Sequence, residues 1–146
     1  MCTIRFVPLK WNYYKECRTL FEGLFNITQH SDFPAEWDDR CEKRSFAALY
    51  YGVVIGFVLV DKTNSIRYIC VNKEFQDEKL GSKLLRHVCD YCVDERAIRL
   101  VTADSEWLVE WYKKYGFRTT HIYRNPDGEF AGADMVRRQR SRSEKN

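Results

Sequence analysis

The sequence predicts a mixed α/β fold in one domain, with about seven strands in a mostly antiparallel sheet and about four flanking helices. Three observations predict it. The length of 146 residues suits one domain, and 45% apolar with 31% charged residues is ordinary for a globular chain. Short segments rich in β-branched and aromatic residues are joined mainly by tight turns, which favour antiparallel pairs. One amphipathic helix links two such segments, and a crossover of that kind makes its strands parallel.

The N-terminal part of the chain predicts a strand and then a helix. Residues 3–9 alternate in polarity and predict a strand, and the apolar stripe of residues 13–25 predicts an amphipathic helix. Residues 26–44 are polar and contain the helix breaker Pro34. We therefore expect a loop with a short second helix there.

The middle of the chain predicts a three-stranded meander and the crossover helix. Residues 45–51 and 53–60 flank Gly52 and predict a hairpin, and residues 66–72 predict the next strand. Residues 79–95 predict a helix with its apolar residues on one face.

The C-terminal part predicts a strand, a helix and a final hairpin. We expect strands over residues 97–102, 118–123 and 130–136, the last two joined by the turn "RNPDG". A helix over residues 106–117 is expected between the first and second of these strands, and it should end at Gly116. Its spacing predicts buried side chains for Trp107, Leu108, Trp111 and Tyr115.

The composition disfavours membrane, secreted and metal-binding classes. No apolar run approaches the roughly 18–20 residues that cross a bilayer. The start "MCTIRFVPLK" lacks the apolar core of a signal peptide, which predicts a cytoplasmic protein. The six cysteines are expected to be buried free thiols, because a core of this size needs no disulfides. The pair Cys89 and Cys92 lacks further ligands, so no metal site is predicted.

The charge is concentrated at the C-terminus. Residues 137–146 hold five basic residues and one acidic residue, +4, so the rest of the chain carries 3 − 4 = −1. We expect residues 1–138 to form the domain and residues 139–146 to form a basic, disordered tail. Nucleic-acid binding through this tail is the least favoured of the functions considered.

The stretch Val71–Leu85 predicts an anion-binding turn. A strand enters it and a helix leaves it, so backbone N–H groups gather at the helix start, where the helix dipole adds about half a positive charge. Gly81 allows close approach to the backbone, and Lys79 and Lys83 add positive charge. A generic strand–turn–helix connection is the alternative.

The segments "YICVNKEFQDEKLGSKLL" and "WLVEWYKKYGF", in this order of elements, resemble the GNAT superfamily of N-acetyltransferases. The resemblance extends over most of the chain, and it implies a twisted sheet that splays in the middle around acetyl-CoA. The family's cofactor loop, Q/R-x-x-G-x-G/A, matches at Gln76 and Gly81, whereas Lys79 replaces the first glycine. A lysine there costs on the order of 1 kcal/mol if that position needs a positive φ.

The same resemblance assigns roles to further residues. Tyr112 would protonate the departing thiolate of coenzyme A, and Ser105 would replace an Asn that bonds the pantetheine arm. The arm would pair with the main chain of one strand, and one of its N–H groups would polarise the thioester. The implied cofactor contacts are Ile69, Cys70, Val71, Gln76, Asp77, Glu78, Lys79, Leu80, Gly81, Ser82, Lys83, Ser105 and Tyr112.

The acceptor is expected to be a cationic amine. In the family, residues 30–44 and 122–132 flank the thioester, and Asp32 and Glu36 beside Phe33 and Trp37 suit an ammonium group. A solvated acidic loop around core aromatics is the alternative. No general base stands out; water and the side chains of Asp32, Glu36, Asp38 and His121 all stay open.

We therefore predict an enzyme, monomeric or homodimeric, that transfers an acetyl group from acetyl-CoA directly to a small amine such as a polyamine. Two alternatives stay open. One is acetylation of a protein at a lysine or an N-terminal amine, and the other is a non-catalytic module that binds acyl-CoA.

Overall fold

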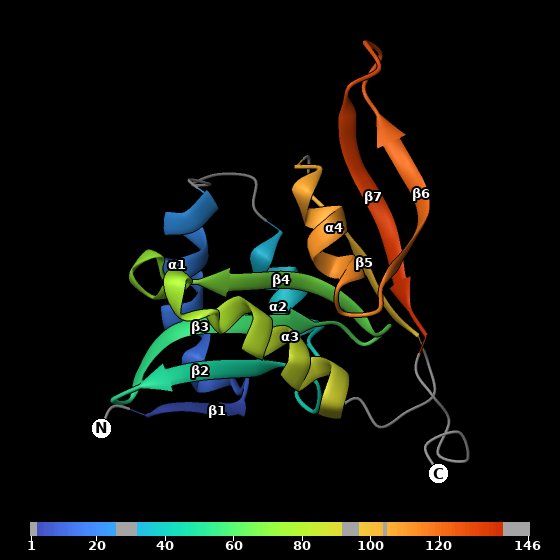
Figure 1. The fold of residues 1–146 in the computed structure, drawn as a ribbon. Helices are drawn as coiled ribbons and strands as arrows, with labels where there is room; N and C mark the ends of the chain where they lie inside the picture. Colours follow the sequence, from blue (N-terminus) through green and yellow to red (C-terminus); the bar gives the residue numbers. More distant parts are fainter. Residues whose placement is uncertain (1–2, 26–31, 92–96, 104, 139–146) are drawn as a thin grey trace, which may run out of the picture. The chain divides into compact units, whose positions relative to one another are not determined.

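The computed structural model describes residues 3–25, 32–91, 97–103 and 105–138 (Figure 1). Its described part contains a seven-stranded sheet with the order β1-β2-β3-β4-β5-β7-β6, together with four α-helices. The one parallel pair joins β4 to β5, with Ser65 opposite Arg99 and Ile66 opposite Leu100. The pairs β1–β2, β2–β3, β5–β7 and β6–β7 are antiparallel. The predicted fold class is confirmed.

The chain divides into two compact units. The first unit comprises residues 1–63 and 67–92, and the second comprises residues 64–66 and 93–146. The elements of the first unit are β1 (Ile4–Pro8), η1 (Trp11–Tyr13), α1 (Tyr14–Phe25), α2 (Phe33–Asp38), β2 (Phe46–Tyr50), β3 (Val53–Val60), most of β4 (Ser65–Val71), η2 (Lys73–Glu78) and α3 (Leu80–Tyr91).

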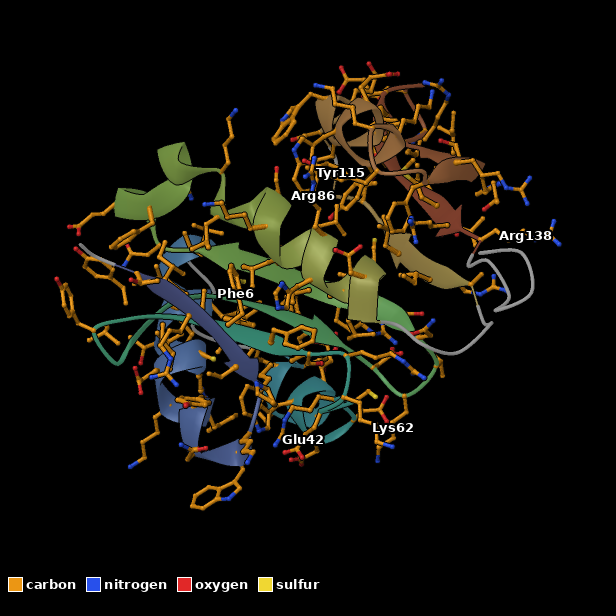
Figure 2. The ribbon with its side chains drawn as sticks, turned by 60° about the horizontal axis from the view of Figure 1, so that its bottom comes forward. Phe6, Glu42, Lys62, Arg86, Tyr115 and Arg138 are labelled. Carbon is orange, nitrogen blue, oxygen red and sulfur yellow. The ribbon has the colours of Figure 1, made fainter. Side chains whose placement is uncertain are left out.

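In the first unit, α1 and α2 cover one face of the strands and α3 covers the other (Figure 1). The face towards α1 and α2 buries an aromatic core that includes Phe21, Phe33 and Phe57. On the α3 side, the ring of Phe6 on β1, which Figure 2 labels, stacks on the ring of His87 of α3, with ring centroids 4.6 Å apart. These two layers hold β3 and β4 between helices.

The predicted hairpin at Gly52 is present and has a tight turn. Tyr51 and Gly52 have φ angles of +51° and +79°. Two successive positive φ angles are typical of the turn that matches the right-handed twist of paired strands. The meander therefore turns from β2 to β3 where the glycine predicts it.

The second unit contains β5 (Ile98–Val101), α4 (Trp107–Lys113), β6 (Arg118–Arg124) and β7 (Phe130–Arg137). Helix α4 is shorter than expected, because Lys114 closes it and a turn leads to Gly116, whose φ is +91°. Arg137 of β7 donates from Nε to the carbonyl of Tyr115 at 2.9 Å. The end of α4 is thereby tied to the hairpin of β6 and β7.

One burial prediction for α4 is wrong. Trp107 is 65% exposed, whereas Leu108, Trp111 and Tyr115 are half-buried. The seven-residue helix begins at Trp107, so this side chain lies at its first turn.

The described cysteines are free thiols, with Cys17 and Cys70 buried and Cys41 and Cys89 half-buried. No helix in the described part of the chain is long and apolar enough to span a membrane. The predicted tail, residues 139–146, lies outside the described residues.

Candidate functional site

The turn between β4 and α3 is held against the end of β4. The Asn72 side chain caps η2 by accepting a hydrogen bond from the Glu74 N–H at 2.9 Å, and the Asn72 N–H donates to the Ile55 carbonyl at 2.8 Å. Gln76 donates from Nε2 to the Val71 carbonyl at 3.2 Å. The Gln76 side chain therefore ties the turn to the last residue of β4.

Lys79 adopts the left-handed conformation, with φ +57° and ψ +30°. This settles the question raised by its replacement of the family glycine: the position does require a positive φ. A residue with a Cβ pays on the order of 1 kcal/mol for that conformation. In return, a left-handed residue after a helical one turns successive N–H groups towards a common point, which is the geometry of an anion-binding nest.

Gly81 lies in the first turn of α3, where neither its backbone conformation nor its packing requires a glycine. Its φ lies outside the left-handed region, and an added Cβ would meet only Val71 Cγ2, at an ordinary 3.9 Å. Glycine within a helix costs about 1 kcal/mol relative to alanine. Because Gly81 has no Cβ, a phosphate can closely approach the N–H groups at the start of α3.

The neighbours of Gly81 divide into core and surface. Leu80 is fully buried, so it offers a ligand only its main chain. Ser82 is half-buried, and both Lys79 and Lys83 are exposed, which places two ammonium groups around the helix start. The side chains of Asp77 and Glu78 lie outside the described residues.

Gly56 on β3 lets β4 and α3 approach it closely, and the sequence analysis did not single it out. A Cβ at this position would lie 2.9 Å from the Cys70 carbonyl oxygen and 3.2 Å from Leu80 Cδ2. Contacts under 3.0 Å to backbone atoms do not occur without displacement. An isolated glycine within a strand pattern is the signal that predicts such close approach.

The strand residues expected to contact the cofactor offer mainly their backbone. The side chains of Cys70 and Val71 are 1% and 9% exposed, and Ile69 is half-buried. Burial raises the pKa of the Cys70 thiol well above its ordinary value. A thiol that resists ionisation is a poor nucleophile, so Cys70 is unsuited to carry an acyl group.

The acidic segment around α2 combines buried aromatics with carboxylates. Phe33 and Trp37 are 0% and 3% exposed and belong to the aromatic core, so their rings pack against other core residues. Asp32 is exposed. Glu36 is half-buried and accepts a short hydrogen bond from the hydroxyl of Tyr68 on β4.

Arg40 anchors α2 to the rest of the first unit. Its guanidinium donates to the Leu9 carbonyl at 2.7 Å and to the Trp37 carbonyl at 3.0 Å, and it stacks 4.4 Å above the Trp37 ring. The carbonyls at the end of α2 are thereby partly satisfied, and the orientation of the helix is fixed.

Tyr112 lies on α4 in the second unit. Its ring contacts Trp111 at 4.9 Å and Phe117 at 5.6 Å, both edge-on. Its carbonyl accepts hydrogen bonds from the N–H groups of Tyr115 and Phe117 at 2.9 and 3.3 Å, which fixes the backbone at the end of α4. None of the residues that the structure describes forms a hydrogen bond with its hydroxyl.

Burial raises the pKa of Tyr112 from 10.0 to about 12. The charged phenolate is disfavoured in these apolar surroundings, so the phenol keeps its proton at neutral pH. A thiol in water has a pKa of roughly 8.5. A thiolate beside the same apolar rings is also destabilised, so the difference between the pKa of the phenol and that of the thiol is smaller than in water. A protonated hydroxyl with no hydrogen-bond partner among the described residues is suited to donate to a ligand.

A groove of about 540 Å³ lies between α4 and the β6–β7 hairpin within the second unit. Its lining includes Glu106, Glu110, Ile122 and Phe130, and Thr119, whose buried hydroxyl has no hydrogen-bond partner in the described chain. Ser105 precedes α4, is half-buried and accepts a hydrogen bond from the Leu108 N–H at its carbonyl.

The remaining proton-acceptor candidates are on the surface. Asp38 and His121 are exposed, and the His121 ring contacts that of Tyr123 at 4.5 Å. No group of three His, Cys, Asp or Glu side chains able to hold a metal ion occurs within the described ranges.

Comparison with solved structures shows a shared fold. Naa50 of Arabidopsis thaliana in complex with the bisubstrate analogue CoA-Ac-MVNAL matches with a TM-score of 0.71 and 18% identity, covering 92% of this chain and 97% of that one. The ribosomal-protein-S18-alanine N-acetyltransferase of Escherichia coli matches with a TM-score of 0.73 and 17% identity, covering 93% and 94%. An aminoglycoside 6'-N-acetyltransferase complexed with coenzyme A matches with a TM-score of 0.71 and 12% identity, covering 92% and 96%.

Comparison by sequence gives one family. The model of the acetyltransferase (GNAT) family matches residues 11–117, which include both the turn before α3 and the tyrosine of α4. No curated protein sequence matches the chain significantly.

Proposed function

Because the chain belongs to the acetyltransferase (GNAT) family, we propose that this protein transfers the acetyl group of acetyl-CoA directly to a primary amine. The observation that carries the proposal is Gly81, a helix-start glycine that neither backbone conformation nor packing requires. Together with the left-handed Lys79, it supports a turn that binds the diphosphate of the cofactor.

Residues 76–83 would hold the diphosphate mainly through main-chain N–H groups. The positive end of the 12-residue helix α3 favours an anion at its start. Lys79 and Lys83 are exposed on both sides of Gly81, and their ammonium groups add charge-assisted contacts. The main chain of Ile69, Cys70 and Val71 would pair with the pantetheine arm, and Ser105 would add a hydrogen bond.

Acetyl-CoA supplies an acetyl group activated as a thioester. The amine nitrogen forms the new C–N bond while the C–S bond breaks, and one amine proton passes to water. Tyr112 donates its phenolic proton to the leaving sulfur and regains one from solvent. The buried thiol of Cys70 supports direct transfer without an acyl-enzyme.

We propose a small cationic amine, such as a polyamine, as the acceptor. The half-buried carboxylate of Glu36 and the exposed carboxylate of Asp32 support a positively charged substrate. The rings of Phe33 and Trp37 lie in the core, whereas Tyr68 is half-buried and keeps part of its surface exposed. We propose that the enzyme acts in the cytoplasm.

Acetylation of a protein is the second candidate. The names of two solved relatives, a ribosomal-protein-S18-alanine N-acetyltransferase and a complex with CoA-Ac-MVNAL, favour it, whereas the aminoglycoside acetyltransferase favours a small acceptor. A turnover screen with acetyl-CoA over polyamines, aminoglycosides, amino acids and basic peptides separates the two.

The variant Tyr112→Phe tests the enzyme assignment. Loss of the proton donor should lower kcat by about 10²-fold or more, while the affinity for coenzyme A, measured by calorimetry, stays within a few-fold. Equal turnover by the variant and the wild type would remove Tyr112 from the mechanism. Retained coenzyme binding without turnover of any acceptor by the wild type would instead indicate a non-catalytic module that binds acyl-CoA.

A further inference from the structure

The pair formed by Glu36 and Tyr68 joins α2 to β4 within the first unit. Glu36 follows Phe33 by three residues and precedes Trp37, so the helix that buries these two rings directs the carboxylate to the margin of the core. Tyr68 packs its ring edge-on against Phe21 at 4.7 Å and lies 5.8 Å from Phe33. The phenol reaches the carboxylate from this packed position.

The pair carries one negative charge and forms no ion pair with the described residues, since none of their lysine or arginine side chains lies within ion-pair distance of Glu36. Arg67 forms its ion pair with the buried carboxylate of Asp61 at 2.7 Å and interacts electrostatically with Glu36 from a longer distance. Burial and the hydrogen bond to Glu36 raise the pKa of Tyr68, so the phenol stays neutral.

The hydrogen bond from Tyr68 fixes the direction of the Glu36 carboxylate, which suits this carboxylate to hold a cation at a defined place. It also matters which cation it binds, because a carboxylate beside the reacting ammonium would hold the proton on that nitrogen and oppose attack. The pair therefore suits a second ammonium group, one that is not acetylated.

The position of Tyr68 on β4 relates the pair to the proposed chemistry. Tyr68 immediately precedes Ile69, and a strand advances about 3.3 Å per residue. Tyr68 and Cys70 both belong to the face covered by α1 and α2, since both pack with the aromatic core. An acceptor that approaches β4 from the α2 face would meet Glu36 close to the strand proposed to line the thioester.

We propose that Glu36, oriented by Tyr68, binds the non-reacting ammonium group of a diamine or polyamine acceptor. The inference rests on the proposed acetyltransferase function and names the feature by which acceptors are selected. Glu36 is the group that contacts the substrate, and Tyr68 is a positioning residue that acts through it.

The test compares putrescine with n-butylamine, which has the same carbon chain but one amine. The wild type should acetylate putrescine with the higher kcat/KM. Glu36→Gln should lower the ratio of the two kcat/KM values by about 10–100-fold, the loss expected for a charge-assisted hydrogen bond. Turnover of n-butylamine should change little. Tyr68→Phe, which keeps the ring, should lower the ratio by a smaller factor.

Asp39→Asn is the matched control, because Asp39 is an exposed carboxylate three residues from Glu36 and the substitution changes the charge equally. It should leave the ratio unchanged, and thermal unfolding checks that all variants fold. An unchanged ratio in Glu36→Gln, or an equal loss in Asp39→Asn, would overturn the inference. So would a wild type that shows no preference for putrescine, although the proposed function would then stand.

Calorimetry with putrescine in the presence of coenzyme A separates the two failures. If no amine is turned over, the proposed function fails, whereas binding of putrescine by the wild type and its loss in Glu36→Gln would still support the carboxylate site. No binding by the wild type in that case would overturn both.

Discussion

At the residue scale, the most informative position is Lys79, where the chain departs from the family pattern. The backbone keeps the left-handed conformation that the family glycine would adopt easily, with φ +57°. The lysine therefore lowers stability, while its exposed side chain places an ammonium group beside the proposed diphosphate site. The cost in stability and the contribution of the ammonium group to coenzyme binding can be measured separately.

Lys79→Gly should raise the free energy of unfolding by about 1 kcal/mol, because glycine has no Cβ to strain. Urea denaturation measures this change. Lys83→Gly is the control: it removes the same side chain within the helix and should lower stability by about 1 kcal/mol. A destabilised Lys79→Gly would contradict the left-handed conformation. We also expect the variant to bind coenzyme A more weakly than the wild type at low salt.

A second prediction at the residue scale concerns the ionisation of Tyr112. Because burial disfavours the phenolate, the tyrosine should ionise near pH 12 rather than pH 10.0. The unfolded chain ionises first, so the contribution to stability is present below about pH 10 and is lost as the pH rises towards 12. The difference between the tyrosinate absorbance titrations of the wild type and Tyr112→Phe isolates this group. A midpoint near 10 in that difference would show that the phenol is solvated.

At the scale of elements, the turn depends on the close contact of β3, β4 and α3. Gly56 permits it, because the Cys70 carbonyl and Leu80 occupy the space that a side chain would need. Leu80 then begins α3 with its side chain in the core and its N–H at the helix start. The close packing of β3 against β4 and α3 thus positions the turn that joins β4 to α3.

Gly56→Ala should destabilise the protein by about 1–3 kcal/mol, since β4 or α3 must move to admit the methyl group. Gly23→Ala is the matched control, because nothing lies within 4 Å of the added Cβ on helix α1. That substitution should stabilise by about 0.5–1 kcal/mol. Thermal or urea unfolding of both variants gives the comparison, and equal effects would refute the packing role of Gly56.

Periodicity and turn chemistry predict most elements well. The hairpin at Gly52, the crossover helix and the parallel pairing of β4 with β5 follow from local pattern. The position of β7 between β5 and β6 was not predicted, because no local pattern decides which strand of the last hairpin pairs with β5. The length of α4 and the exposure of Trp107 were missed, because a seven-residue helix offers too few turns for spacing to define its buried face.

The contacts of the candidate site are less accessible to prediction. The hydrogen bond between Tyr68 and Glu36 joins residues 32 positions apart, and no local pattern relates them. The aromatics Phe33 and Trp37 were placed beside the acceptor on composition, but tertiary packing encloses them in the core. The residues of the turn before α3 are consecutive, so the sequence alone brings them together, and their binding of the cofactor stays a prediction.

At the scale of the whole molecule, the chain has the fold and the family match of an acetyltransferase. The first unit carries the turn and the pair of Glu36 and Tyr68, and the second carries Ser105 and Tyr112. The proposed chemistry requires little from side chains: main-chain N–H groups bind, one phenol donates a proton, and one carboxylate selects the acceptor. Binding of the cofactor by the main-chain N–H groups is the step on which the other two depend.

A crystal structure of the protein with coenzyme A bound tests that dependence most directly. We expect diphosphate oxygens within about 2.7–3.2 Å of main-chain nitrogens between residues 77 and 82, with no side chain displaced at Gly81. A nucleotide bound elsewhere, with these N–H groups facing only water, would contradict the account.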